Sequence, residues 1–346
     1  MTYSSSPGTY ILTGSSDRSI RLYNPSPDSS STAHLSSSIT STPKGPAPLP
    51  QGKLIQAYTS HSHEVLSLCI SASNASFVSS GGDRTVFLWD VATATTTRRF
   101  GSSTSSQGHS ARVNCVAFAA PDDAVVISGS VDTTVRLWDV RSSSARPIQV
   151  LSEAKDSVTA LAVTGDAEFV AASVDGRVRT YDVRAGRVVT ETMGASVTSL
   201  CLARDDRTLL VGSLDSKVRL MDRSDGRCLR TYSAPDRKNE ELRVQSVLGG
   251  GDRYVVSGDE MTSSSSAEYE GRVWAWDLLS GEVVAKLAVP WGSDGRRKTV
   301  LGRDGRERAR KNVVSCLAWK QGGGPGANQF CVGGTSGAVV VFGEGG

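Results

Sequence analysis

A short frame that recurs along the chain constrains the fold more than any other feature of the sequence. In its clearest copy, "SGSVDTTVRLWDVR" (residues 128–141), an Asp stands six residues before a Trp, and an alternating apolar run lies between them. With Tyr, Met or Phe admitted in place of the Trp, and with two degenerate copies, the frame occurs seven times. The copies lie at Asp17/Tyr23, Asp83/Trp89, Asp132/Trp138, Asp175/Tyr181, Asp215/Met221, Glu270/Trp276 and Ser336/Phe342.

The same pattern of strands surrounds each copy. A β-prone strand precedes the Asp ("VVISGS", "LLVGS"), and an alternating strand follows it ("TVRLWD", "KVRLMD"), with the period of 2 that is typical of a half-buried sheet. The Asp occupies the tight turn between them, where its side chain can bond its own backbone. A further strand lies upstream in most copies and a shorter one downstream. Successive frames are 40 to 66 residues apart, so the chain predicts an all-β, seven-bladed propeller with insertions, built as one domain over residues 1–346.

The frame resembles the WD repeat, and seven copies predict a seven-bladed WD40 propeller. In that family a His before the first strand, a Ser in the second, the turn Asp and the Trp form a hydrogen-bonded tetrad. The residues that fit are His109, Ser128, Asp132 and Trp138 in one copy, and His61, Ser79, Asp83 and Trp89 in another. His109 and Asp132 could be an acid/base pair. We favour the structural interpretation, a buried network that holds the connection between blades.

Composition and motifs argue against several function classes. The net charge is only +3, too small for the whole surface to attract a polyanion. No apolar run approaches the about 18 residues of a membrane span, and the N-terminus lacks a secretory signal. Neither a phosphate-binding loop nor a nucleophile elbow is present, so we expect no enzymatic activity and no small-molecule substrate.

Cysteine and histidine usage predicts neither a metal nor a cofactor. The four histidines include the pair His61 and His63, but the repeat already accounts for His61, and no Cys/His cluster accompanies it. None of the six cysteines is spaced C-x-x-C, and we expect buried, reduced thiols. The six are Cys69, Cys115, Cys201, Cys228, Cys316 and Cys331.

Three insertions interrupt the repeat. Residues 25–52 in blade 1 are rich in Ser and Pro and predict a disordered loop. Residues 260–270, "EMTSSSSAEYE", extend the central turn of blade 6. Residues 292–311 form a basic loop between blades 6 and 7. In an antiparallel meander the second and third insertions emerge on one face, which we expect to be a partner surface, and the first emerges on the other.

The basic loop is the candidate site for partner binding. It contains eight basic residues against three acidic ones. It could bind RNA phosphates or an acidic protein, although it lacks aromatic residues for base stacking. A solvated loop without a partner is an equally good interpretation. The basic residues are Arg296, Arg297, Lys298, Arg303, Arg306, Arg308, Arg310 and Lys311.

Part of the chain resembles one WD-repeat family more closely than WD repeats in general. The stretches "LSEAKDSV" and "SVDGRVRTYDVR", within residues 150–188, are similar to the mitogen-activated protein kinase organizer family, scaffolds also found among spliceosomal proteins. The resemblance implies a non-catalytic protein scaffold in the nucleus and cytoplasm. The first setting to test is the spliceosome and pre-mRNA splicing. The alternative is a mitogen-activated protein kinase module, and direct RNA binding through the basic loop is a weaker one.

The two ends of the repeat array depart from the family pattern. The first blade begins at "TYILTGSSDRSIRLYNP" without an inner strand before it, and the last ends at "AVVVFGEGG" without an outer strand after it. We therefore expect both blades to be incomplete, with unpaired strand edges, and a segment upstream of residue 1 that would supply the missing strands.

Overall fold

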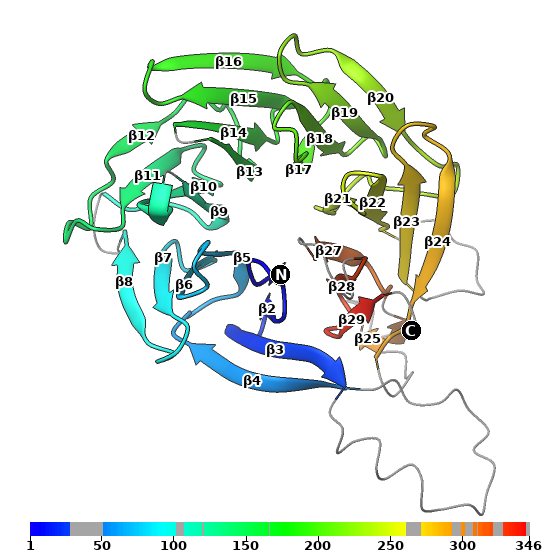
Figure 1. Ribbon diagram of the computed structural model, residues 1–346, viewed down its shortest axis with the longest axis horizontal. Coiled ribbons are helices and arrows are strands. Elements are labelled where there is room, and N and C mark those ends of the chain that lie inside the picture. The colour runs from blue at the N-terminus through cyan, green and yellow to red at the C-terminus, as the bar shows by residue number, and fades with distance from the viewer. Residues whose placement is uncertain are drawn as a thin grey trace, which may run out of the picture.

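Seven small antiparallel sheets stand around a central axis in the computed structural model, with both chain ends near blades 1 and 7 (Figure 1). The structure describes residues 1–27, 51–101, 107–119, 121–165, 167–260, 271–292, 299–301, 307–309, 311–320 and 328–343. The chain is an all-β, seven-bladed propeller, as the repeat predicts. Each blade is a meander whose strands follow one another outward from the axis.

The first two strands of each blade lie nearest the axis, and the second is the more deeply buried, as β6 and β18 show. The first strands are β1 (Thr2–Tyr3), β5 (Val65–Ile70), β9 (Val113–Ala119), β13 (Val158–Thr164), β17 (Val197–Leu202), β21 (Ser246–Gly249) and β27 (Val314–Trp319). The second strands are β2 (Ile11–Gly14), β6 (Ser76–Gly81), β10 (Val125–Ser130), β14 (Glu168–Ser173), β18 (Thr208–Ser213), β22 (Tyr254–Gly258) and β28 (Phe330–Gly334).

The outer positions complete six of the seven blades. The third strands are β3 (Ser19–Pro27), β7 (Val86–Asp90), β11 (Val135–Asp139), β15 (Arg177–Asp182), β19 (Val218–Asp222), β23 (Gly271–Asp277) and β29 (Val339–Phe342). The fourth strands are β4 (Gly52–Thr59), β8 (Thr96–Phe100), β12 (Gln149–Leu151), β16 (Arg187–Thr192), β20 (Cys228–Tyr232) and β24 (Val283–Val289). Among the described residues blade 7 has three strands, as expected.

The prediction that blade 1 lacks its inner strand is wrong. Thr2 and Tyr3 form β1 and pair with Leu12 and Ile11 of β2. Tyr3 is buried in a cluster with Ile11 and with Cys331 of blade 7, which joins the two ends of the array. A strand of two residues is too short to show the alternation by which strands are recognised in a sequence.

The turns between the second and third strands have a common backbone geometry. The residue after the frame's first residue has positive φ in six blades, a conformation that tight turns require. These residues are Arg18, Arg84, Thr133, Gly176, Ser216 and Gly337. The side chain of Asp132 accepts a hydrogen bond from the amide of Thr134 at 3.0 Å, and Asp175 does the same for Arg177 at 3.1 Å. We call the face of the ring with these turns, and with the connections between blades, the Asp-turn face.

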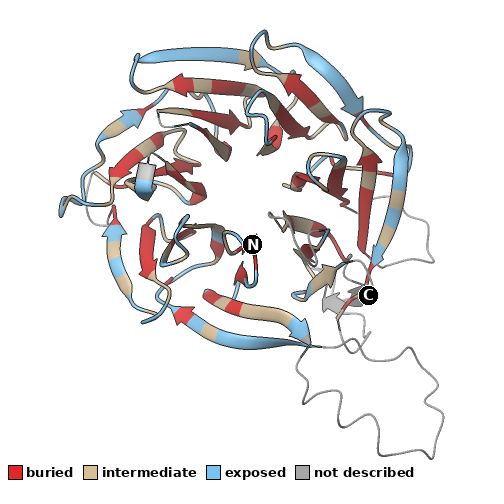
Figure 2. Ribbon diagram, viewed as in Figure 1, coloured by how far each residue is buried: buried red, intermediate tan, exposed pale blue. Residues whose placement is uncertain are grey.

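The hydrophobic core lies between neighbouring blades. In one cluster Leu12 and Tyr58 of blade 1 pack with Phe77 and Trp89 of blade 2. Figure 2 shows the outermost strands largely exposed and the strands inside them buried. Because each blade covers the apolar face of the next, the ring is a continuous structure and not a set of separate units.

The insertions differ in part from their predicted boundaries. The Ser/Pro-rich insertion is shorter than 25–52, because β3 continues through residues 25–27 and Pro27 pairs with Gly52 of β4. The expected disorder falls on residues 28–50, which lie outside the described residues. The basic loop contains a two-stranded hairpin, β25 (Thr299–Leu301) and β26 (Glu307–Ala309). Its strands have three residues each, again too few for recognition by alternation.

Candidate functional site

The four predicted residues of blade 2 form one hydrogen-bonded network. His61 Nδ1 lies 2.6 Å from Asp83 Oδ2, and His61 Nε2 lies 2.7 Å from Ser79 Oγ. The indole Nε1 of Trp89 donates to the same Ser79 Oγ at 2.8 Å. The network joins the connection before β5 to the turn and third strand of the blade. His61 is therefore a structural residue of the Asp-turn face.

Blade 3 repeats the arrangement with its own four residues. His109 Nδ1 lies 2.9 Å from Asp132 Oδ2, and His109 Nε2 lies 2.8 Å from Ser128 Oγ. Trp138 Nε1 donates to Ser128 Oγ at 2.8 Å. Burial lowers the pKa of His109. The neutral ring thus donates from Nδ1 to Asp132 and accepts the Ser128 hydroxyl at Nε2.

The geometry argues against an acid/base role for His109 and Asp132. Both ring nitrogens are occupied, and the His109 side chain is 1% exposed, so no ring atom can reach an external substrate. Burial alone would raise the pKa of Asp132, but hydrogen bonds from His109 and Thr134 hold it well below its usual range. The pair is the internal support of the blade 3 turn.

Blades 4 and 5 use arginine where blades 2 and 3 use histidine. In blade 4, Arg179 Nη2 lies 2.6 Å from Asp175 Oδ2, and Nη1 donates to Ser173 Oγ at 2.8 Å. In blade 5, Arg219 pairs with Asp215 and donates to Ser213 Oγ at 2.7 Å. The arginine stands four residues after the turn Asp on the third strand, so the same turn is fixed from a different position.

We expect the replacement of Asp175 by Asn to remove a pH-dependent part of the stability. Burial alone would raise the pKa of Asp175, but hydrogen bonds from Arg179 and Ser173 lower it to about 2. An unfolded Asp titrates near ~3.9, so the native carboxylate stabilises the fold above about pH 4 and loses this effect as the pH falls towards 2. Urea midpoints of the wild type and Asp175→Asn should therefore converge between about pH 5 and pH 2. A constant separation, or the same convergence in the control Asp225→Asn, would contradict the assignment.

In blade 6 a buried arginine, Arg237, bonds the Ser of the second strand, as His or Arg does in blades 2 to 5. Arg237 is 2% exposed and donates to Ser257 Oγ at 2.7 Å, to the Ser216 carbonyl at 2.9 Å and to the Gly258 carbonyl at 3.3 Å. Burial lowers the pKa of Arg237 to about 10, against the opposing effect of nearby carboxylates. Arg237 remains charged at neutral pH and connects the turn of blade 5 to blade 6.

The carboxylate of Glu260 anchors the connection between blades 5 and 6. Glu260 is 1% exposed and accepts backbone N–H groups of Glu240 and Glu241, each at 3.0 Å, and of Leu242. Three successive amides that converge on one carboxylate form an anion-binding nest. Glu260 is the first residue of the predicted insertion 260–270, and its hydrogen bonds fix it in place. Residues 261–270 lie outside the described residues.

The insertion in blade 6 and the basic loop between blades 6 and 7 have described ends that lie side by side. The amide of Val314 donates to the Asp259 carbonyl at 3.3 Å, and Asn312 Nδ2 donates to the Val289 carbonyl at 2.9 Å. A Cβ on Gly271 would lie 2.9 Å from the Asn312 carbonyl oxygen. The insertion that follows Glu260 and the connection that ends at Lys311 therefore start from one place on the Asp-turn face, as the meander predicts.

Polar side chains tie the inner strands together where they begin, on the same face. Asn114 donates to the Val158 carbonyl at 2.8 Å. Thr159 donates to the Val197 carbonyl at 2.7 Å. Arg243 in blade 6 reaches across the axis and donates to the Asn114 carbonyl in blade 3 at 3.0 Å. The first two bonds link neighbouring blades, and the bond from Arg243 links blades 6 and 3, which are not neighbours. Together they make the ring one rigid support.

Comparison with known families identifies the repeat. The model described as "WD domain, G-beta repeat" matches residues 3–24, 52–90, 101–139, 145–182 and 187–222, about half of the chain. The chain belongs to the WD40 family. The matched stretches correspond to blades 1 to 5, including the four-residue networks of blades 2 and 3.

Several known proteins are similar to the chain, and the share of the chain that each match covers differs. The WD repeat domain-containing protein 83 homolog of Dictyostelium discoideum is 27% identical over 310 residues, 82% of each chain. The rat WD repeat domain-containing protein 83 is 37% identical over 154 residues, so the match spans 44% of each chain. The guanine nucleotide-binding protein subunit beta of Zea mays is 30% identical over 226 residues, 65% of this chain and 47% of that protein.

Most residues of the predicted basic loop lie outside the part of this WD40 chain that the structure describes. Arg296, Arg297, Lys298, Arg303, Arg306 and Arg310 lie outside the described residues, and Arg308 is placed only by its backbone in β26. Lys311 is exposed and directly precedes Asn312. The basic loop thus remains a prediction whose described end lies on the Asp-turn face.

The described part of the chain contains neither a cluster of metal-ligating side chains nor a membrane-spanning helix. No group of three or more His, Cys, Asp or Glu side chains there could hold a metal ion, and no described helix could span a membrane. All six cysteines are free. Cys115 and Cys331 are buried, as expected, and Cys69, Cys201 and Cys316 are half-buried. The expectation of a buried thiol is wrong for Cys228, which is exposed on the outer strand β20.

Sequence reasoning missed the charged residues that replace histidine. Arg179 and Arg219 each stand four residues after a turn Asp, and this spacing could have revealed them. No such signal precedes Arg237 or Glu260, because neither belongs to the frame. Their roles depend on the approach of two blades in space.

Proposed function

We propose that this WD40 chain is a non-catalytic protein-interaction scaffold whose partners bind the Asp-turn face at blades 6 and 7. The observation that carries the proposal is the hydrogen-bonded base around Glu260 and Asn312, from which the two insertions start. Functional residues are concentrated on loops held by a rigid scaffold. The turns between the second and third strands of blades 2 to 5 are short and bonded through their own Asp side chains, so they offer little that distinguishes one WD40 protein from another.

The setting that we propose first is the spliceosome and pre-mRNA splicing, with the protein in the nucleus and the cytoplasm. The resemblance of residues 150–188 to the kinase organizer family, whose members are also found among spliceosomal proteins, supports it. The same resemblance supports an alternative, a scaffold for a mitogen-activated protein kinase module. Both settings rest on family analogy, which is weaker than an argument from a site. Direct RNA binding would rest on the basic loop alone.

Affinity capture tests the proposal and separates its settings. The tagged full chain is incubated with nuclear and cytoplasmic extracts, with and without RNase, and the retained proteins are identified by mass spectrometry. We expect spliceosomal proteins that survive RNase. Retention of kinase-module proteins alone would favour the alternative setting. Loss of every partner on RNase treatment would favour direct RNA binding, which becomes weaker as salt rises. If the chain retains no specific protein from either extract, the result would contradict the scaffold proposal.

A further inference from the structure

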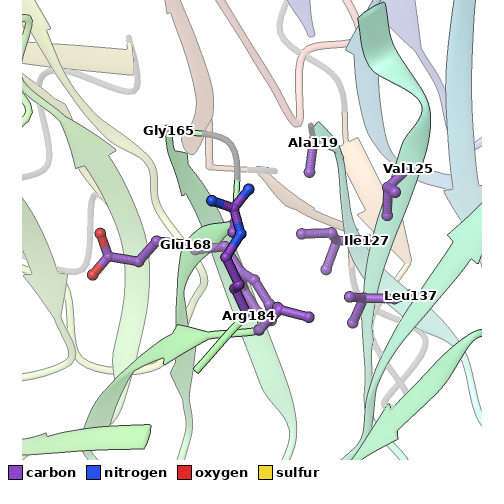
Figure 3. Close-up of a pocket in the computed structure, with 10 residues that line it drawn as sticks. Ala119, Val125, Ile127, Leu137, Gly165, Glu168 and Arg184 are labelled. Carbon is purple, nitrogen blue, oxygen red and sulfur yellow. The ribbon is translucent and has the colours of Figure 1, made fainter. Parts of the chain in front are cut away.

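An apolar pocket opens between blades 3 and 4, on the face opposite the Asp-turn face. It has a volume of about 170 Å³ and lies where the first and second strands of blade 4 meet. Figure 3 shows Ile127, Leu137, Val125 and Ala119 along one side. Phe169 completes the lining from blade 4. The pocket is thus an opening into the core between two blades.

The size and lining of the pocket suit a large apolar side chain. An engineered protein cavity of about 150 Å³ lined by Leu, Ile and Phe stays free of water and binds benzene. The present pocket is similar in volume and in the type of its lining residues. A Leu or Phe side chain from outside would therefore replace weakly held water and contact the core directly.

The charged side chains at the rim of the pocket indicate which kind of peptide would bind there. Glu168 lies at the pocket, but its carboxylate points away from the apolar residues (Figure 3) and pairs with Arg223 at 3.0 Å. Arg184 is exposed and also lines the pocket. Within the described part of the chain, no hydrogen bond or ion pair occupies its guanidinium. The rim therefore presents a cation that is free to pair with a carboxylate.

We propose that this pocket receives a Leu or Phe side chain of an acidic peptide segment in a partner protein, with a neighbouring carboxylate of that segment paired to Arg184. The inference deepens the proposed scaffold function and rests on it. It adds a second partner site on the opposite face, so that two partners could bind the ring at once.

Methyl NMR titration with a defined peptide tests the pocket. The probe is the acetylated, amidated peptide Glu-Glu-Leu-Glu-Glu, and the matched control peptide has Ala in place of Leu. We expect saturable shifts of the Ile127 and Leu137 methyl signals, with affinity at least about tenfold higher for the Leu peptide because it buries the larger side chain. Equal affinities, or shifts absent from these methyl groups, would overturn the proposal.

Variants of the pocket give an independent test. Ala119→Leu, which fills the cavity from its edge, should abolish binding, and Arg184→Gln should weaken it about threefold. Arg227→Gln changes an exposed arginine elsewhere and should have no effect. If the Ala119→Leu variant is folded, as judged by its methyl spectrum, and still binds the peptide with unchanged affinity, the proposed pocket is wrong. If the peptide fails to bind while extract proteins are still captured, only this inference fails, and if nothing is captured the scaffold itself fails.

Discussion

Replacement of Trp138 by Ala should lower the free energy of unfolding by about 3–5 kcal/mol, the usual cost of removing a fully buried large aromatic side chain. Trp138 is 1% exposed and packs in the cluster between blades 2 and 3. The change also leaves Ser128 without the indole donor. Urea denaturation followed by circular dichroism measures the loss.

A second substitution at Trp138 separates its packing from its hydrogen bond. Trp138→Phe retains most of the buried ring but removes the indole N–H. We expect it to cost less than Trp138→Ala, with about 1 kcal/mol due to the hydrogen bond. Leu279→Ala is the control, because Leu279 is 81% exposed and should lose almost nothing. A loss below about 1 kcal/mol for Trp138→Ala would contradict the structural role of the network.

Glu260→Ala should cost about 1–3 kcal/mol, because three backbone N–H groups lose the buried carboxylate that accepts their hydrogen bonds. Besides lowering the global free energy of unfolding, the substitution should weaken the protection of nearby amides. In hydrogen exchange, the amides of Glu240, Glu241 and Leu242 should exchange faster, while those of blade 3 keep their protection. Capture of partners from extracts should fall with it, because the base of both insertions is loosened.

Two controls make the Glu260 result interpretable. Glu260→Gln keeps one carbonyl oxygen and should have an intermediate effect on stability and on exchange. Glu282→Gln alters an exposed carboxylate in the same blade and should have neither effect. Unchanged exchange at residues 240–242 in Glu260→Ala would show that the carboxylate does not hold this connection.

The sequence predicts what the repeat imposes on every blade. The frame predicts seven blades, the position of the turns and the face on which each insertion emerges, because a polar turn residue followed by an alternating strand recurs in every blade. The four-residue networks of blades 2 and 3 follow from the same frame. Blade 7 has three strands among the described residues, as the sequence predicts.

What the sequence could not predict depends on short segments or on contacts between blades. β1 has two residues and gains its stability from Ile11 and from blade 7 rather than from its own pattern. The strands β25 and β26 have only three residues each and are also too short to recognise by alternation. Glu260 looks like part of a polar insertion, and only the approach of residues 240–242 shows that its charge is buried. The pocket between blades 3 and 4 likewise exists only in the assembled ring.

Hydrogen-exchange footprinting of the full chain bound to a captured partner locates the partner surface. We expect slower exchange at residues 236–244 and 311–314, which form the base of the insertions on the Asp-turn face. Footprinting with the same partner after RNase treatment should give the same protection, because the contact is between proteins. Protection confined to the outer strands, or its disappearance after RNase treatment, would contradict a protein-interaction surface at blades 6 and 7.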